Sequence, residues 1–253
     1  KDFNFGLSMM AAYTRSASTS VSEGIGDQVS SAYNTMTYGV NGSNVPELGH
    51  SAYVSPNRII ANVSYRIPEP GVGATTIGLF YEGYNHCYVG NYSYTRFSYV
   101  MNDGKNALTG DGGAANLIYI PTDADLDDMP FVDNDNKAAY KAFIENDRYL
   151  NAHRGEYSQR GGVVAPMQHR FNFKVAQDFD FNVAGKKNTI QVAVDVNNLG
   201  NLLNSNWGAY KKLSSDVILQ YKDGVYTFTE PKWSKITTVS STWEMLLSLR
   251  WFF

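Results

Sequence analysis

The residues best suited to bind a metal ion form an acidic run between positions 123 and 135. Aspartates stand at every second position from Asp123 through Asp125 to Asp127, a spacing found in calcium-binding loops. Such a loop of the helix–loop–helix type needs glycine at its sixth position and glutamate at its twelfth, where this chain has Asp128 and Asn134. Asp123, Asp125 and Asp127 are therefore candidate calcium ligands. The alternative is a solvated acidic loop without metal, and no other cofactor is expected.

The residues that could carry out nucleophilic catalysis are Cys87 and the histidines His86 and His169. Cys87 follows His86, but adjacent residues of a strand point to opposite faces, and no third group is placed to orient the histidine. The glycines from Gly110 to Gly113 lack the strand and helix that flank a phosphate-binding loop. A surface protease or lipase would need His86 or His169 beside Asp or Ser. We therefore expect that the chain is not an enzyme.

Aromatic side chains are the third group with chemical potential. They make up 14% of the residues and are frequent in the long segments between predicted strands, where they could stack on sugar rings or contact peptide. The alternative is that they pack these segments together. The net charge of −3 excludes a surface of the kind that binds nucleic acid. The candidate ligand-binding residues are Tyr92, Tyr94, Tyr99, Tyr119, Trp207, Tyr210 and Trp233.

Six segments alternate between apolar and polar residues with the period of two that indicates β-strands. The last is the clearest, because one face carries only Trp243, Met245, Leu247, Leu249, Trp251 and Phe253. The sequence predicts an all-β chain with antiparallel strands near 2–14, 58–67, 75–100, 169–183, 189–200 and 240–253. Gln177 is the one break in the apolar row of its strand. The first predicted strand begins with the chain itself, from which we expect a piece of a longer protein or a processed chain.

The connections between these strands differ in length in a regular way. Those at 68–74 and 184–188 are short and rich in turn residues, whereas 15–57, 101–168 and 201–239 are long. Long loops on one side and short turns on the other are typical of outer-membrane barrels. A helix is predicted at 137–153, begun by Asp135 or Asn136 and ended by Gly155. It would pack the connection down through Tyr140, Phe143, Ile144 and Leu150, or serve as a lid.

The alternation has one more consequence, because the second face of each strand is polar. In a transmembrane barrel the apolar face meets lipid, and Asp178, Asp195, Glu244 and Arg250 face the lumen or a plug. Six strands are too few to close a barrel, so the chain would be the C-terminal part of a larger one, or several copies would share a barrel. A water-soluble β-sandwich is the alternative fold.

Four phrases of the sequence carry a resemblance to a known family. They are Asn116–Pro121 (NLIYIP), Tyr149–Tyr157 (YLNAHRGEY) with Arg160 and Pro166, His169–Phe179 (HRFNFKVAQDF) and Asn201–Gly208 (NLLNSNWG). Together with the aromatic last strand, they resemble the C-terminal barrel region of TonB-dependent outer-membrane receptors. The similarity is greatest to the Bacteroidetes-type receptors with a carboxypeptidase-regulatory-like extension.

This resemblance implies a 22-stranded barrel, closed by an N-terminal plug, that imports an oligosaccharide, a peptide or a chelate. The implied partners are outer-membrane lipid, the rest of the barrel with its plug, the TonB complex acting through an N-terminal part, and in some relatives a surface lipoprotein. The last strand, from Trp243 to Phe253, would serve as an assembly signal. The plug and TonB box are not in this sequence, and the alternative is a non-transporting barrel in adhesion or surface assembly.

Overall fold

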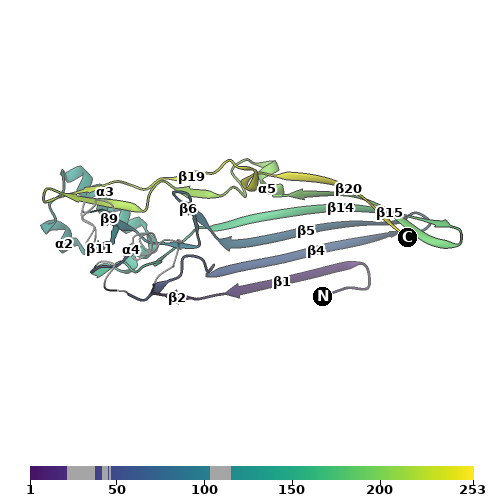
Figure 1. Cartoon of the computed structure of the whole chain (residues 1–253), viewed down its shortest axis with the longest axis horizontal. Coiled ribbons are helices and arrows are strands. Elements are labelled where there is room, and N and C mark those ends of the chain that lie inside the picture. Colours follow the sequence, from purple (N-terminus) through teal and green to yellow (C-terminus); the bar gives the residue numbers. More distant parts are fainter. Residues whose placement is uncertain (22–37, 42–44, 46, 103–114) are drawn as a thin grey trace.

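We describe a computed structural model of the chain, in which residues 1–21, 38–41, 45, 47–102 and 115–253 are placed well enough to be described. Strands account for 52% of the residues and helices for 15%, which confirms the prediction of a mainly β chain. The molecule consists of one long sheet and, beyond one end of it, a cap of small sheets and helices (Figure 1). In the described part of the chain, no helix has the length and apolar character needed to cross a membrane.

The long sheet contains six antiparallel strands, each paired with the next one in the chain. Its two edges are β1 and β20, so the sheet is open over the described residues. The strands that it contains, in spatial order, are β1 (Leu7–Arg15), β4 (Asn57–Glu69), β5 (Gly73–Asn85), β14 (Met167–Val183), β15 (Lys186–Asn197) and β20 (Glu244–Phe252).

The register of the sheet places the predicted apolar residues of all strands on one face. Val63 of β4 pairs with Leu79 of β5, which pairs with Phe173 of β14. The same row continues through Val196 of β15 to Met245 of β20. Since side chains alternate between faces, the neighbouring rows two residues away are apolar as well. The polar residues between them therefore share the opposite face.

Two tight turns connect strands at the end of the sheet that lies away from the cap. The turn between β4 and β5 has positive φ angles at Gly71 (80°) and Gly73 (145°), and the turn between β14 and β15 has them at Ala184 (53°) and Gly185 (79°). Such angles suit glycine because it has no Cβ. A Cβ on Gly73 would lie 2.1 Å from a carbonyl oxygen of β14. The turn and the pairing of β5 with β14 therefore depend on glycine at this position.

The first and last strands begin later than the sequence predicts. Residues 1–6 do not continue β1 but fold back on it, because the chain reverses at Gly6 (φ 94°) and the Phe3 amide donates to the carbonyl of Leu7 (2.8 Å). At the C-terminal end, a 3-10 turn, η1 (Val239–Ser241), precedes β20, which begins at Glu244.

The third predicted strand ends at Asn85 and not near residue 100. Its partner β14 begins at Met167, opposite Asn85, directly after Pro166, which has no N–H for a further ladder bond. The chain then leaves the long sheet and forms β6 (Cys87–Val89), β7 (Tyr92–Tyr94), β8 (Arg96–Phe97) and β9 (Val100–Asn102) in the cap. The strand predicted at 189–200 ends at Asn197. The φ angle of Asn198 is 54°, so the chain leaves the extended conformation at this residue.

The cap is built from short strands that pair across long distances in the sequence. One sheet has the order β10 (Ala115–Leu117), β9, β17 (Val217–Lys222) and β18 (Val225–Phe228), and another has β19 (Trp233–Lys235), β16 (Lys211–Leu213), β6 and β7. The remaining pairs are β11 (Tyr119–Ile120) with β12 (Glu156–Tyr157), β13 (Val163–Val164) with β8, and β2 (Thr19–Ser20) with β3 (Gly49–His50).

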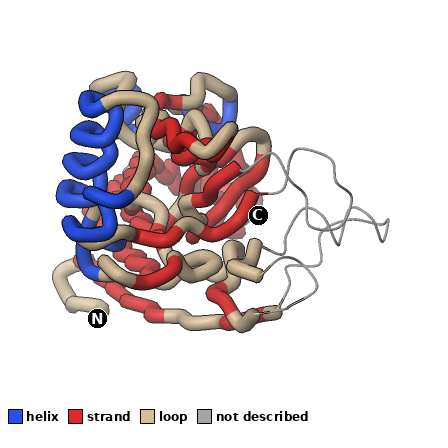
Figure 2. Tube along the Cα trace, turned by 90° about the vertical axis from the view of Figure 1, so that its left-hand side faces the viewer, coloured by secondary structure: helices blue, strands red, loops and turns tan. Residues whose placement is uncertain are grey.

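The helices lie along one side of the cap strands (Figure 2). They are α2 (Asp123–Asp128), α3 (Asn134–Asn146) and α4 (Arg148–Ala152), with α5 (Leu199–Leu203) after β15. The helix predicted at 137–153 is thus divided. Asp133, and not Asp135 or Asn136, caps α3 by accepting from the Asn136 amide (2.7 Å), and Asp147 ends α3 and caps α4.

The main hydrophobic core of the described residues lies in the cap and not against the long sheet. The predicted inward side of the helices contributes Tyr140, Ile144 and Leu150, which are fully buried, while Phe143 packs against them. Strands of the cap add Ile120 and other residues, which are Cys87, Val89, Phe97, Tyr99, Val163, Leu213, Ile218, Leu219 and Phe228. The helices therefore hold the cap together, as the packing alternative predicts.

Candidate functional site

The polar face of the long sheet is crossed by ion pairs between strands. Arg58 pairs with Glu82 (2.6 Å) near the cap, and Lys174 pairs with Asp195 (3.1 Å) in the middle of the sheet. The side chains of the predicted lumen-facing residues Asp178, Asp195, Glu244 and Arg250 alternate with the apolar row and so share this face. Most of the charge on this face is thus neutralised within the sheet.

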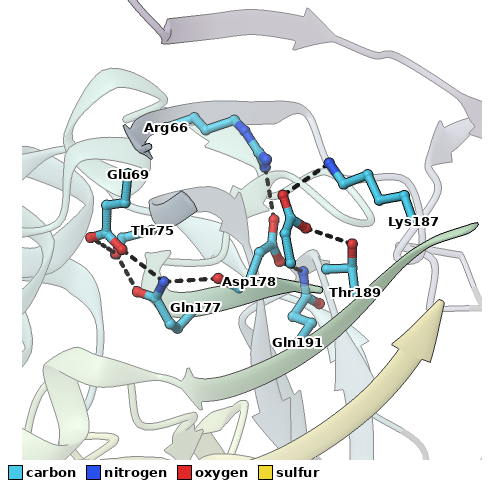
Figure 3. A network of polar contacts seen from close by, with 9 residues as sticks. Arg66, Glu69, Thr75, Gln177, Asp178, Lys187, Thr189 and Gln191 are labelled. Atoms are coloured by element: carbon cyan, nitrogen blue, oxygen red, sulfur yellow. Dashed lines mark hydrogen bonds and ion pairs between the residues drawn. The ribbon is translucent and has the colours of Figure 1, made fainter. Parts of the chain in front are cut away.

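A denser network lies on the same face near the turns (Figure 3). Asp178 is 8% exposed and accepts from Arg66 (3.1 Å) and from Gln191 (2.8 Å). Asp180 accepts from Thr189 (2.6 Å) and pairs with Lys187 (2.9 Å). The acceptors on β14 are therefore matched by donors from two other strands, β4 and β15, which fixes the register of this end of the sheet.

Figure 3 also explains the break in the apolar row at Gln177. Its carboxamide nitrogen donates to Glu69 (2.9 Å), and its oxygen accepts from the Thr75 hydroxyl. The Thr75 hydroxyl also lies 2.8 Å from Glu69, so its one hydrogen is shared between these two acceptors. These three polar side chains share the apolar face but bond to one another, so the polar groups of this patch are largely satisfied within the protein.

The candidate site is a hollow of about 300 Å³ where the polar face meets the cap. Three neighbouring strands supply Asn172, Asn197 and Glu244, which lie side by side in the ladder because Phe173 pairs with Val196 and Asn197 pairs with Glu244. The other lining residues are Glu82, Arg170, Tyr210, Val239, Ser240 and Thr242. The hollow thus combines one cation, two carboxylates, two carboxamides and several hydroxyl groups.

Arg170 is held in place at the side of the hollow. One guanidinium nitrogen donates to the Tyr210 hydroxyl (3.2 Å) and another to the carbonyl of Ser240 (3.0 Å), while the guanidinium lies 5.3 Å from the centre of the Tyr210 ring. A guanidinium carries five N–H donors in a fixed plane, so donors remain for a ligand. Arg170 is therefore a rigid hydrogen-bond donor in the hollow.

Aromatic rings support Arg170 from the side of the cap. The Tyr210 hydroxyl lies 3.2 Å from that of Tyr84, and the ring of His86 lies 4.7 Å from the Tyr210 ring. Burial, and then the charge of Arg170, lowers the pKa of His86, so this imidazole is neutral at pH 7. Tyr210, one of the predicted ligand-binding aromatics, thus lines the hollow, and its ring and hydroxyl also hold Arg170 in place.

The other predicted ligand-binding aromatics lie elsewhere in the cap. Tyr99 is 4% exposed, and its hydroxyl donates to Asp147 (3.0 Å), so it belongs to the core and cannot reach a ligand in this conformation. Tyr119 donates to Asp125 (3.0 Å), and the rings of Tyr94 and Trp233 pack against neighbouring aromatic rings. The structure thus does not bring these residues together in one site.

Three of the predicted aromatics are exposed, namely Tyr92 (58%), Trp207 (57%) and Trp233 (42%). The apolar side chains of the last strand are also exposed, on the other face of the sheet, at Trp243, Met245, Leu247, Leu249, Trp251 and Phe253. Sequence reasoning did not select Glu82, Arg170, Asn172 and Asn197. The signal that could have found them is that each is a polar-face residue near the cap end of its strand.

The acidic run forms a helix start and not a loop. Asp123 bonds to Arg154 (2.9 Å) and Lys141 (3.2 Å), and Asp125 completes a capping box with Thr122. Hydrogen bonds from the Thr122 side chain and backbone, and then from Tyr119, lower the pKa of Asp125. In the described ranges, no group of three or more His, Cys, Asp or Glu is placed to hold a metal ion.

Two further candidates from the sequence are Cys87 and the glycines Gly110 to Gly113. Cys87 is fully buried, and burial raises the pKa of its thiol to about 12, so the thiolate needed of a nucleophile is scarce at neutral pH. The glycines Gly110 to Gly113 lie outside the described residues. Comparisons of the chain with protein-family models, with curated proteins and with solved structures find no match.

Proposed function

We propose that this chain is the C-terminal part of the β-barrel of a TonB-dependent outer-membrane receptor, which imports an oligosaccharide, a peptide or a chelate. The observation that carries the proposal is the apolar face of the long sheet, which runs in register over six strands, with one self-bonded polar patch at Gln177, and is left uncovered. In lipid, such a face is at its lowest free energy, while the opposite, ion-paired face meets water or a plug.

The degree of exposure argues against water as the solvent of this face. Leu247 is 71% and Leu249 is 75% exposed, and Val63, Leu79 and Phe171 are each close to 40%. Uncovered apolar patches that extend over a whole sheet are rare in water-soluble monomers and promote association. The polar groups of the same strands are paired on the other face, so the two faces differ as the two sides of a barrel wall do.

The length of the apolar face fits the thickness of an outer membrane. Aromatic rings mark both its ends on β14, with Phe171 near the cap and Phe181 near the turns. About ten residues separate them, which corresponds to about 33 Å along a strand at about 3.3 Å per residue. A strand tilt of about 40° reduces this to about 25 Å across the membrane, the height of the apolar band of such barrels.

The cap and the hollow suit the capture of a ligand from outside the cell. The three long connections are all at one end of the sheet, and the short turns are at the other (Figure 1). Outer-membrane barrels place long connections outside and short turns in the periplasm. The hollow would then open to the lumen just below the external surface, where Arg170, Asn172, Asn197 and Glu244 supply donors and acceptors for a polar ligand.

The proposal also assigns the free edges of the sheet. Six strands do not close a barrel, and unpaired edges invite pairing with further strands. We assign β1 and β20 to pairing with the remaining strands of a longer receptor. The plug and the contact with the TonB complex would come from its N-terminal part, and a surface lipoprotein could cover the cap. No bond is made or broken in this function, since transport needs only binding and plug movement.

Spin labels on neighbouring residues of the last strand test the membrane assignment. In the full receptor in bilayers, a label at Leu247→Cys should be relaxed by oxygen, which concentrates in lipid. A label at Ser248→Cys should be relaxed by a water-soluble nickel complex. The buried Cys87 should not be labelled. Nickel access at both positions, or at neither, would contradict a lipid-facing wall, because the two side chains point in opposite directions.

Growth of the native organism tests the receptor function. A strain without the protein should lose growth on one nutrient supplied as oligosaccharide, peptide or chelate, and the full receptor should restore it only when the TonB complex is present. A barrel in adhesion or surface assembly would leave growth unchanged and alter attachment instead. Arg170→Ala should weaken uptake of that nutrient, whereas Lys186→Ala removes an exposed cation near the turns, at the other end of the sheet, and serves as the matched control.

A further inference from the structure

A second hollow lies at the cap end of the sheet, on the apolar face. It has a volume of about 600 Å³ and is lined on the sheet side by Asn57 and Asn85. On the other side it is lined by Arg148 and Tyr149 of the helix α4 and by His153, which directly follows this helix. Asn57 stands just before the apolar row of β4, and Asn85 stands just after that of β5, on the same face of the sheet. This groove therefore begins where the exposed apolar face ends.

The rim between the face and the groove is made of polar aromatic side chains. The exposed Tyr13 donates its hydroxyl hydrogen to Asn57 (2.8 Å). The hydroxyl of Tyr81 lies 2.8 Å from Nδ1 of His169, and the two rings stack. Rings with an apolar body and a polar tip are enriched where hydrocarbon gives way to headgroups. The groove therefore lies at headgroup depth when the apolar face is in lipid.

The charges in the groove favour an anion. Arg148 is exposed and has no ion-pair partner in the described part of the chain. The one carboxylate in the lining, Asp147, already accepts from the amides of Tyr149 and Leu150 and from the Tyr99 hydroxyl. Three donors thus already stabilise the negative charge of Asp147, while Arg148 lines the groove without an ion-pair partner among the described residues.

His153 adds a second polar group to the groove. Its Nδ1 lies 2.9 Å from the carbonyl oxygen of Tyr149, and since a carbonyl only accepts, Nδ1 carries the hydrogen. The other ring nitrogen then carries a lone pair and accepts from a donor of a ligand. The guanidinium of Arg148 matches the oxygens of a phosphate group, and the acceptor on His153 suits a hydroxyl group beside that phosphate, as in a glycerol headgroup.

We propose that this groove binds the phosphate-bearing headgroup of an anionic lipid, whose acyl chains lie along the apolar face below. This inference rests on the proposed function, because it needs that face to be in a bilayer. It adds a site outside the barrel wall, distinct from the polar hollow on the other face. Cationic grooves beside membrane-spanning segments recognise anionic headgroups in this way.

The test uses the full receptor in nanodiscs of phosphatidylcholine with increasing phosphatidylglycerol. Native mass spectrometry should find retained phosphatidylglycerol on the wild type. Arg148→Ala should reduce its apparent affinity about fivefold, the effect of one cation near a membrane surface. His153→Ala should reduce it less. Lys222→Ala removes an exposed cation elsewhere in the cap and should leave it unchanged.

Two further measurements complete the test. One distinguishes a lipid headgroup from free phosphate, and the other separates a failure of this inference from a failure of the membrane assignment. Inorganic phosphate at millimolar concentration should not displace the lipid, and displacement would assign the groove to free phosphate. Equal retention of the lipid by Arg148→Ala and wild type would overturn the inference. A failed barrel assignment is seen separately, since the label at Leu247→Cys would then report water in the same nanodiscs.

Discussion

Two buried tyrosines of the cap are predicted to respond in opposite directions to the loss of one oxygen atom. Tyr140 is fully buried, and its hydroxyl has no hydrogen-bond partner in the described part of the chain. Tyr99 is almost as buried, but its hydroxyl donates to Asp147, which also caps α4. Phenylalanine keeps the ring in both cases, so each substitution tests the hydroxyl alone.

The magnitudes follow from the partners of the two hydroxyls. A buried polar group without a partner costs about 1–3 kcal/mol, and the small void left by its removal offsets part of the gain. Tyr140→Phe should therefore stabilise the cap by about 1 kcal/mol. Tyr99→Phe removes a hydrogen bond to a carboxylate and should destabilise it by about 1–2 kcal/mol.

Hydrogen exchange of peptides from α3 and α4, in the full protein, measures these changes. For amides that exchange through opening of the cap, 1 kcal/mol corresponds to about a fivefold change in rate. Exchange should slow in Tyr140→Phe and accelerate in Tyr99→Phe, with Tyr92→Phe unchanged as an exposed control. Faster exchange in Tyr140→Phe would refute the reasoning, because it would mean that this hydroxyl has a partner.

Three other results are expected. The buried thiol of Cys87, with its pKa raised to about 12, should resist alkylation at pH 8 in the folded protein and react only in denaturant; rapid labelling of native protein would contradict this. Because hydrogen bonds of Thr122 lower the pKa of Asp125 in the folded state, Asp125 stabilises α2 above its unfolded pKa of about 3.9 and loses this effect as the pH falls through the lower folded value. The protection of α2 amides, which is their exchange relative to the intrinsic rate at the same pH, should therefore fall below pH 4 in the wild type and depend less on pH in Asp125→Asn; equal pH dependence in both would argue against the cap. Gly73→Ala should accelerate hydrogen exchange of the paired ends of β5 and β14, because its Cβ would collide with the backbone of β14, whereas Gly71→Ala, which also has positive φ but open space around it, should change this exchange less; equal exchange in the two variants would contradict the collision.

The strands of the long sheet could be predicted because their signal is local. Each alternates over several residues, and short turns fix which strands pair, so both the face and the neighbour of Leu79 or Val194 follow from nearby sequence. The same signal failed at the N-terminus, where the alternation of Phe3 and Phe5 continues into Leu7 although the chain reverses at Gly6. When a chain reverses direction and both segments alternate with a period of two, the sequence pattern alone does not reveal the reversal.

The cap and the hollow could not be predicted in this way. Strands of two or three residues are too short to show a period, and β9 pairs in parallel with β17, more than a hundred residues further along the chain. Likewise, Arg170 acquires its role only through Tyr210 and Ser240, from a connection forty or more residues away. Local sequence contains no information on such contacts, which depend on how three long connections pack together.

The chain divides its apolar residues between two kinds of burial, and this division explains its composition. The cap buries Tyr140, Ile144 and Leu150 inside a core of its own, as any domain in water does. The sheet leaves Leu247 and Leu249 uncovered and pairs its charges on the other face. On the proposed assignment to a membrane, only every second residue of the six strands needs to be apolar for contact with lipid, which agrees with a mean hydropathy of −0.33. The cap would then gain free energy from its own core and the sheet from the lipid around it, so the proposal predicts that the sheet is stable only in apolar surroundings.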